Sequence, residues 1–163
     1  MRKAIYPGSF DPFTNGHLDI VRRALRVVDH LTIAVLRNTS KRYLLSPEER
    51  VELIREVFQH EENIEVMTFE GLLAEFCRQR DTKLVIRGLR AVSDFDYEHA
   101  IFLMNSKLLE GLETIFLMSS SEHSFISSSI VKEVSSLGGV VDDQVPPPVA
   151  RKLRQLHKER SGA

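Results

Sequence analysis

The sequence is poor in cysteine, has no long apolar run and carries no excess of charge of either sign. Its one cysteine, Cys77, cannot form an internal disulfide, which is typical of proteins from reducing compartments. No segment approaches the run of about 18 apolar residues that a membrane span needs, and no apolar signal segment precedes the first predicted strand. We therefore expect a cytoplasmic protein without a membrane partner, in which Cys77 is a small buried hydrophobe.

The absence of net charge limits the classes of ligand. The 22 Lys and Arg residues stand against 23 Asp and Glu residues, so the formal net charge is -1. A chain with this balance does not attract nucleic acid through its overall field, and its aromatic residues are not interleaved with basic ones. Any anionic ligand must be held by local groups. With 163 residues, 42% of them hydrophobic, the chain suffices for a single domain spanning 1–163.

Apolar segments rich in β-branched residues alternate with segments of helical periodicity. This alternation predicts an α/β fold in which a five-stranded parallel sheet carries helices on both faces. The predicted strands cover 3–7, 31–36, 64–69, 83–87 and 113–118. The predicted helices run from about Gly16 to Val28, over 47–58, 71–80 and 93–109, from near Ser128 to before Gly138, and over 148–159. The last is amphipathic, and the triple proline at 146–148 is expected to stay outside a helix until Pro148.

The first candidate site is the segment YPGSFDPFTNGH at 6–17, between the first strand and the first helix. Ligands of open α/β sheets bind at the carboxyl ends of strands. Gly8 and Gly16 allow a phosphate to approach the backbone, the helix start supplies N–H groups, and His17 would donate to the ligand as a neutral or a charged group. The alternative is two simple turns and a half-exposed histidine. TxGH after GSFDP resembles the phosphate-binding signature of the nucleotidylyltransferase superfamily, which favours the site.

A second candidate is the pair of arginines that follows the fourth strand. Arg87 and Arg90 can each present a forked guanidinium to phosphate oxygens. The alternative is a pair of surface arginines that form ion pairs with Asp94, Asp96 or Glu98.

Two further polar segments follow predicted strands. The hydroxyls of 127–129 lie at a predicted helix start, where they can cap the helix, bind an anion or do both, and Lys132 can be an ordinary solvated lysine. In the segment 39–42, Lys41 can neutralise an acceptor phosphate or lie in a surface loop without function. Polar segments after the first, second, fourth and fifth strands predict one site that holds a triphosphate beside a second anion.

The whole pattern resembles a known family. YPGSFDPFTNGH, SKRYLLSPEER, IRGLRAVSDFDYE and FISSSIVKEV are similar to motifs of the bacterial phosphopantetheine adenylyltransferases, over residues 3–134. The resemblance implies a Rossmann-like domain and the Mg²⁺-assisted reaction of ATP with 4′-phosphopantetheine, which gives dephospho-coenzyme A and pyrophosphate in coenzyme A synthesis. It also implies a homohexamer. Feedback binding of coenzyme A and the metal ligands stay open, although Mg²⁺ is expected to be held mainly by ATP phosphates and water.

The resemblance also implies the roles of individual residues. His17 and Lys41 are expected to be catalytic. The expected acceptor-binding residues are Ser9, Lys41, Leu73 and Arg87. The expected ATP-binding residues are Ser9, Phe10, His17, Gly88, Leu89, Arg90, Glu98, His123, Ser124, Phe125, Ile126, Ser127, Ser128 and Ser129. Two positions depart from the family pattern, because some members have Thr at Ser9 and an aromatic residue is common at His123. Tyr97 and Asn105, in the same helix as Glu98, receive no role.

The expected mechanism needs no general base, because the acceptor phosphate already carries a nucleophilic oxygen. Positioning and charge stabilisation are then the catalytic effects. Two alternatives remain open. One is a related enzyme for another acceptor, such as nicotinate mononucleotide or glycerol phosphate, which the RGLR and SFISSSIVKE segments disfavour. The other is a nucleotide-sensing module without turnover, which the presence of His17 and Lys41 disfavours.

Overall fold

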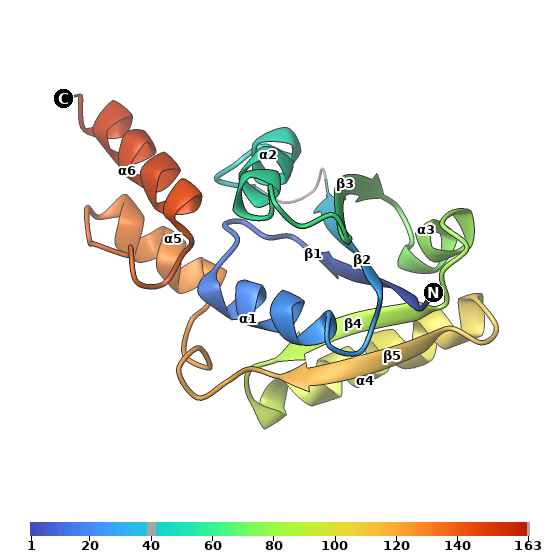
Figure 1. The fold of residues 1–163 in the computed structure, drawn as a ribbon. Helices are drawn as coiled ribbons and strands as arrows, with labels where there is room; N and C mark the ends of the chain where they lie inside the picture. Colours follow the sequence, from blue (N-terminus) through green and yellow to red (C-terminus); the bar gives the residue numbers. More distant parts are fainter. Residues whose placement is uncertain (39–41, 163) are drawn as a thin grey trace.

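The computed structural model describes residues 1–38 and 42–162. Its five strands form one parallel sheet in the order β3-β2-β1-β4-β5 (Figure 1). The strands are β1 (Lys3–Gly8), β2 (His30–Arg37), β3 (Ile64–Glu70), β4 (Leu84–Leu89) and β5 (Glu113–Met118). Each lies within two residues of the predicted range at either end, so the α/β fold and the five-stranded parallel sheet are confirmed.

Six helices occur in the described ranges, at the predicted places. They are α1 (Asn15–Ala24), α2 (Pro47–Val57), α3 (Leu73–Gln79), α4 (Val92–Leu108), α5 (Ser128–Ser136) and α6 (Pro147–Ser161). Helix α1 ends four residues before the predicted Val28, although Val28 is still buried in the core. The expectation that α6 begins at Pro148 was wrong. Pro147 lies in the first turn, where a missing N–H removes no helical hydrogen bond.

The helices cover both faces of the sheet, as predicted. Helices α1, α2, α5 and α6 pack on one face, where side chains from all five strands complete the larger core cluster. Helix α3 and the end of α4 pack on the other face around Phe69, Phe76 and Cys77. Burial raises the pKa of the Cys77 thiol to about 11. Cys77 is therefore an inert core residue, as the sequence indicates.

The strand order creates a switch point at the centre of the sheet. From β1 the chain proceeds to β2 and β3 on one side, and it then returns to β4 and β5 on the other. The connections that leave the carboxyl ends of β1 and β4 therefore diverge, and this divergence opens a crevice between the two strands in folds of this type. Among the described residues, the polar segments that follow β1, β4 and β5 lie at that edge.

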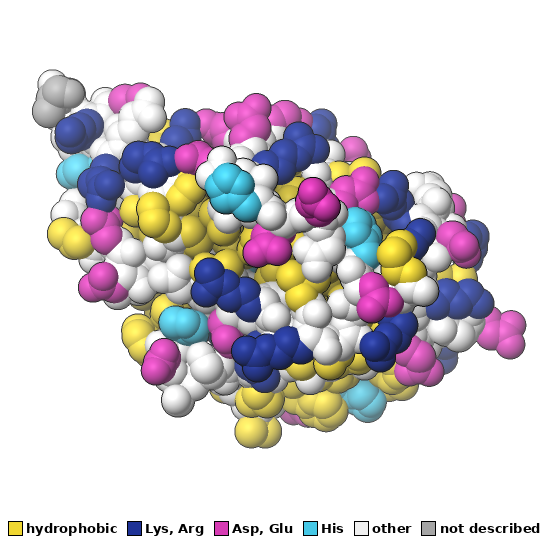
Figure 2. Space-filling model, viewed as in Figure 1, with side chains coloured by type: hydrophobic (Ala, Val, Ile, Leu, Met, Phe, Trp, Pro, Cys, Tyr) yellow, Lys and Arg dark blue, Asp and Glu magenta, His cyan; other side chains and the backbone are white. Residues whose placement is uncertain are grey.

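The distribution of charged side chains on the surface agrees with the balanced charge of the sequence. On the face shown in Figure 2, basic and acidic side chains are intermingled and form no large area of one sign. In the part of the chain that the structure describes, no helix combines the length and the apolar composition needed to cross a membrane.

Candidate active site

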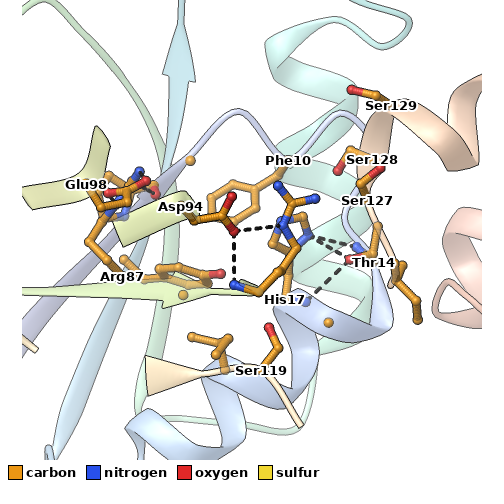
Figure 3. A pocket seen from close by; sticks show the side chains of 18 of the residues that line it. Phe10, Thr14, His17, Arg87, Asp94, Glu98, Ser119, Ser127, Ser128 and Ser129 are labelled. Atoms are coloured by element: carbon orange, nitrogen blue, oxygen red, sulfur yellow. Dashed lines mark hydrogen bonds and ion pairs between the residues drawn. The ribbon is translucent and has the colours of Figure 1, made fainter. Parts of the chain in front are cut away.

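A cavity of about 510 Å³ lies at the carboxyl ends of β1 and β4, at the switch point (Figure 3). Many of the residues expected from the sequence line it, and they come from three separate segments, within 10–17, 87–98 and 126–129. The lining includes the predicted Phe10, His17, Arg87, Gly88, Arg90, Glu98, Ile126, Ser127, Ser128 and Ser129. Arg87 and Glu98 stand on one side of the cavity, while Thr14 and the serines at the start of α5 stand on the other. The prediction of one shared site at the strand ends is thus supported by geometry.

His17 is held by the residue that caps its own helix. The His17 Nδ1 atom accepts the Thr14 N–H at 3.0 Å, and it lies 3.1 Å from Thr14 Oγ1. In return, Thr14 Oγ1 accepts the His17 N–H at 3.4 Å. These contacts form a reciprocal capping box, in which histidine takes the place usually filled by Glu or Gln. The TxGH spacing is therefore the spacing from N-cap to N3, and it sets the orientation of the imidazole.

The protonation state of His17 follows from its surroundings. Burial of the ring, which is the largest cause, and the positive charges of Arg90 and Arg87 together lower its pKa to about 4. The ring packs edge-on against Phe10, with centroids 5.1 Å apart, and lies 5.4 Å from Phe13. At neutral pH the imidazole is therefore uncharged. Because Nδ1 is an acceptor, the proton resides on Nε2, and His17 faces the cavity as a neutral donor.

Arg87 is fixed on three sides. Its Nε donates to Glu98 Oε2 at 2.6 Å, its Nη2 donates to Glu98 Oε1, and its Nη1 donates to the Pro7 carbonyl at 2.9 Å. The Glu98 side chain is 11% exposed, so this ion pair is shielded from bulk water. The sequence left two interpretations of Arg87, phosphate binding and an ion pair with a carboxylate. The ion pair is confirmed, and the paired side chains nevertheless line the cavity. Glu98 thus holds a rigid guanidinium at the end of β4.

Arg90 makes a looser pair at the cavity edge. The Arg90 N–H donates to Asp94 Oδ2 at 3.0 Å, and the guanidinium Nε lies 3.5 Å from the same oxygen. Asp94 also lines the cavity. With His17 neutral, the two arginines and the carboxylates of Asp94 and Glu98 cancel in formal charge. A polyanion in this cavity therefore needs further positive groups.

The start of α5 supplies part of that positive potential. Ser127 caps the helix, because its Oγ accepts the Ile130 N–H at 3.2 Å. Ser128 Oγ instead donates to the Pro12 carbonyl at 2.8 Å and ties α5 to the loop after β1. First-turn N–H groups have no acceptor within their own helix, and they favour anions. Ser127 therefore caps the helix, Ser128 anchors the loop, and both line the cavity together with Ser129. These serines do more than cap the helix, which was the alternative interpretation.

Several expected site residues lie outside the lining of the cavity. Leu89 is buried in the core, Phe125 is 67% exposed, and the Ser9 carbonyl accepts a hydrogen bond from Arg50 at 2.5 Å. Leu73 lines a separate small cavity, which shares Arg87 and Glu98 with the main one. The remaining expected residues outside the lining are His123 and Ser124. Lys41 lies outside the described residues, so its expected role stays a prediction.

Other residues of the site were missed by the sequence reasoning. Tyr6 belonged to the first candidate segment but received no role of its own; it lines the cavity from β1, and burial raises the pKa of its hydroxyl. Ser93 and Ser119 follow β4 and β5, so their positions at strand ends were the signal that could have found them. Asp94 was considered only as a partner of arginine. Asn105, which received no role, lines the small cavity with Leu73.

Comparison with known proteins identifies the family. The cytidylyltransferase-like family matches residues 5–134. A phosphopantetheine adenylyltransferase of Leptospira biflexa serovar Patoc is 55% identical over 150 residues, which are 92% of this chain and 94% of that protein. The enzyme with the same name from Moorella thermoacetica is 50% identical over 153 residues, or 94% and 96% of the two chains. One from Clostridium botulinum (strain Eklund 17B / Type B) is 50% identical over 149 residues, or 91% and 94%. This chain therefore belongs to the phosphopantetheine adenylyltransferase family, within the cytidylyltransferase-like proteins.

Proposed function

We propose that this protein transfers the adenylyl group of ATP to 4′-phosphopantetheine, giving dephospho-coenzyme A and pyrophosphate. The names of its relatives supply the acceptor. The observation that carries the proposal is the neutral His17 imidazole, whose Nδ1 is occupied by Thr14 in a cavity that Arg87, Arg90 and the start of α5 also line. A donor that is fixed in place and uncharged suits an oxygen that gains negative charge only as the reaction proceeds.

In the proposed reaction an oxygen of the acceptor phosphate attacks the α-phosphorus of ATP in line. The new P–O bond forms as the bond to the β-phosphate breaks, and pyrophosphate leaves with the electron pair. His17 donates from Nε2 to a nonbridging oxygen of the α-phosphate, where charge develops. No proton has to be removed from the nucleophile, which agrees with a histidine that is neutral and held by its own helix cap. Lys41 remains the expected partner of the acceptor phosphate.

Mg²⁺ is part of the proposal as a cofactor bound with ATP. Within 1–38 and 42–162, no three His, Cys, Asp or Glu side chains are grouped as a metal cage. Asp94 is the nearest cavity carboxylate to Arg90, and it is already engaged with that arginine. This donor set fits an ion held mainly by phosphate oxygens and water, as Mg²⁺ prefers in nucleotide sites. When bound, the ion would neutralise part of the phosphate charge. The cavity side chains do not do this, because the charges of the two arginines and of Asp94 and Glu98 cancel one another.

We also propose that the protein assembles as a homohexamer in the cytoplasm. The supporting feature is α4, which carries several exposed apolar side chains: Val92, Phe95, Leu103, Met104 and Leu108. Apolar side chains are visible along the lower edge of Figure 2, where α4 runs in Figure 1. An exposed apolar area of this kind is typical of a protein interface. Light scattering on the purified protein gives the number of subunits, and a monomer would contradict the proposal.

The experiment that tests the function is an acceptor panel. The protein is incubated with ATP, Mg²⁺ and either 4′-phosphopantetheine, nicotinate mononucleotide or glycerol 3-phosphate, and pyrophosphate release is followed. Of the three acceptors, we expect only 4′-phosphopantetheine to give turnover. Turnover with another acceptor would identify a different transferase, and ATP binding without turnover would identify a sensing module. Adding coenzyme A to the same assay tests feedback binding. Coenzyme A contains chemical groups of both substrates, and this similarity favours its binding at the same site.

A further inference from the structure

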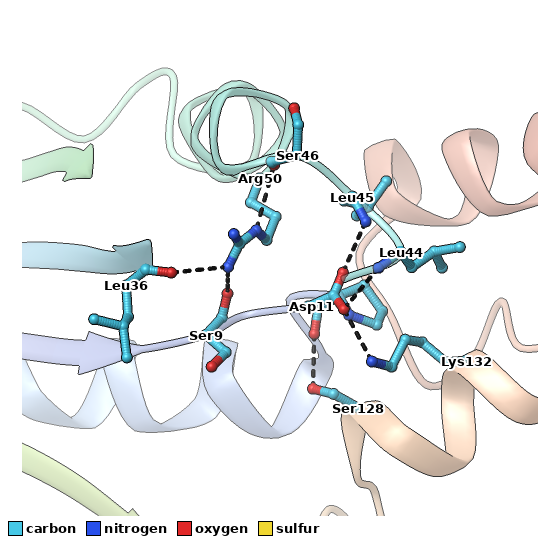
Figure 4. Close-up of polar contacts among 10 residues, drawn as sticks. Ser9, Asp11, Leu36, Leu44, Leu45, Ser46, Arg50, Ser128 and Lys132 are labelled. Atoms are coloured by element: carbon cyan, nitrogen blue, oxygen red, sulfur yellow. Dashed lines mark hydrogen bonds and ion pairs between the residues drawn. The ribbon is translucent and has the colours of Figure 1, made fainter. Parts of the chain in front are cut away.

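Asp11 is a buried carboxylate that the proposed reaction does not use. Its side chain is 3% exposed and lies outside the lining of the main cavity. Its Oδ1 accepts the Leu45 N–H at 3.0 Å (Figure 4). Its Oδ2 accepts the Leu44 N–H at 3.0 Å and the Lys132 Nζ at 2.9 Å. A buried carboxylate needs such donors, because an unpaired one would lose its hydration without compensation.

These four residues, named here the Asp11 cluster, join three segments that are distant in the sequence. Asp11 belongs to the loop after β1, the two leucines belong to the connection between β2 and α2, and Lys132 belongs to α5. The interpretation of Lys132 as an ordinary solvated lysine is therefore wrong, since it pairs with a carboxylate 121 residues away in the sequence. The Asp11 cluster sets how the three strand-end segments lie relative to one another.

Two neighbouring contacts strengthen the same junction. Arg50, 1% exposed, donates from Nη1 to the Ser9 carbonyl at 2.5 Å and to the Leu36 carbonyl at 3.2 Å. It thereby ties the end of β2 and the loop after β1 to α2 (Figure 4). Ser128 Oγ makes the second contact, to the Pro12 carbonyl, which directly follows Asp11. The loop that leads from β1 to His17 at the start of α1 is thus bound to both neighbouring segments.

We propose that Asp11 is a positioning residue of the adenylyl transfer, which holds the connection between β2 and α2 in register with the loop that leads to His17. This inference rests on the proposed function. The connection also contains Lys41, the expected partner of the acceptor phosphate, three residues before Leu44 in the sequence. Two bound substrates react only when nucleophile and phosphorus are aligned, and a displacement of about 1 Å can lower the rate by about 100-fold. Holding Leu44 and Leu45 by their backbones limits such a displacement.

The contacts of Asp11 reach the acceptor side of the site through the connection between β2 and α2. Arg90, which is expected to bind ATP, instead pairs with Asp94 of α4, and no member of the Asp11 cluster is among its hydrogen-bond or ion-pair partners. The orientation of His17 depends on Thr14, within the same helix cap. Loss of the Asp11 carboxylate should therefore disturb the acceptor and the alignment of the reaction more than the binding of ATP.

The test is Asp11→Asn, which keeps the size of the side chain and places an amide donor among N–H and ammonium donors. We expect kcat/KM for 4′-phosphopantetheine to fall about 100-fold, with a raised KM, while ATP affinity measured by calorimetry without acceptor stays close to that of the unchanged protein. The matched control is Asp29→Asn. Asp29 also accepts a backbone N–H, that of Arg2 at 2.6 Å, but at the opposite end of β1. Its kinetics should not change.

A merely structural role would give a different result. Fewer folded molecules would lower kcat and the number of ATP sites together and leave both KM values unchanged, and that outcome would overturn the proposal, as would unaltered kinetics. If Asp11→Asn does not fold, Lys132→Met decides, because it leaves both backbone contacts of Asp11 in place. It should raise the KM for the acceptor in the same direction, and an unchanged KM would overturn the proposal. Lack of turnover by the unchanged protein would instead reject the proposed function itself, and this role with it.

Discussion

Replacing His17 by alanine removes both of its roles, as a donor to the substrate and as part of the α1 capping box. The variant loses the Nε2–H that faces the cavity and the Nδ1 acceptor of the Thr14 N–H. Removal of one fixed donor to a developing oxyanion costs about 3 to 4 kcal/mol, and about 1.4 kcal/mol corresponds to tenfold in rate. We therefore expect kcat to fall about 100- to 1,000-fold, with a smaller change in ATP affinity.

The same substitution should also lower stability, and this effect has to be separated from catalysis. Loss of a helix cap costs about 1 kcal/mol of unfolding free energy. Helix α2 offers the matched control, because Glu49 holds the same N3 position and accepts the Ser46 N–H at 2.8 Å. Glu49→Ala should lose comparable stability in urea unfolding and keep the kcat of the unchanged protein.

The assay is steady-state release of pyrophosphate, combined with calorimetric titration of ATP and urea unfolding for both variants. Our reasoning would be refuted by a His17→Ala variant that keeps its kcat. It would equally be refuted if the two capping-box variants lost activity to the same degree, because the loss would then come from the helix cap and not from the donor.

Three further predictions follow from buried or paired groups. The pKa of His17 is lowered to about 4, so the unfolded chain binds this proton first as the pH falls below about 6.5, and the free energy of unfolding decreases from there to about pH 4. His17→Gln should make the slope of unfolding free energy against pH shallower in this window, and urea unfolding that gives an equal slope would contradict the pKa. Glu98→Gln leaves the shielded Arg87 without its carboxylate and should lower the free energy of unfolding in urea by about 3 kcal/mol. The control Glu75→Gln, in an exposed ion pair, should lower it by almost nothing. Equal losses in the two variants would disprove the shielding. Cys77, with its pKa raised to about 11, should resist a thiol reagent at pH 8 until the protein is unfolded, and rapid labelling of the folded protein would show that it is not buried.

Elements with strong local signals were predicted well from the sequence. The start of α2 is specified by the N-cap Ser46, by Pro47 in the first turn and by Glu49, which completes the capping box. All three signals are local in the sequence. The carboxyl end of α1 and the start of α6 were predicted less well. Val28 keeps the apolar periodicity because it packs in the core, yet it lies beyond the helix. Periodicity reports burial, and a buried side chain does not need a helical backbone.

The site was predicted in its location and only partly in its chemistry. Segments after parallel strands meet at one edge of the sheet whatever their sequence, so motifs such as TxGH could be assigned to one cavity. The protonation of His17 could not be predicted, since it depends on burial and on Arg87 and Arg90, which lie in another segment. Arg50 gave no signal either, because an arginine on a helix usually faces water, whereas here it is buried under two strand ends.

The sequence by itself determined the order of strands and helices, the local helix caps and the set of polar segments that follow the strands, because these depend on neighbouring residues and on the periodicity of apolar side chains. Tertiary structure alone decided which charges meet: Arg87 with Glu98, Arg90 with Asp94, and Asp11 with Lys132. The reason is physical. Ion pairing and desolvation act over a few ångströms in space, and distances across the chain exist only once the sheet has brought its strand ends together.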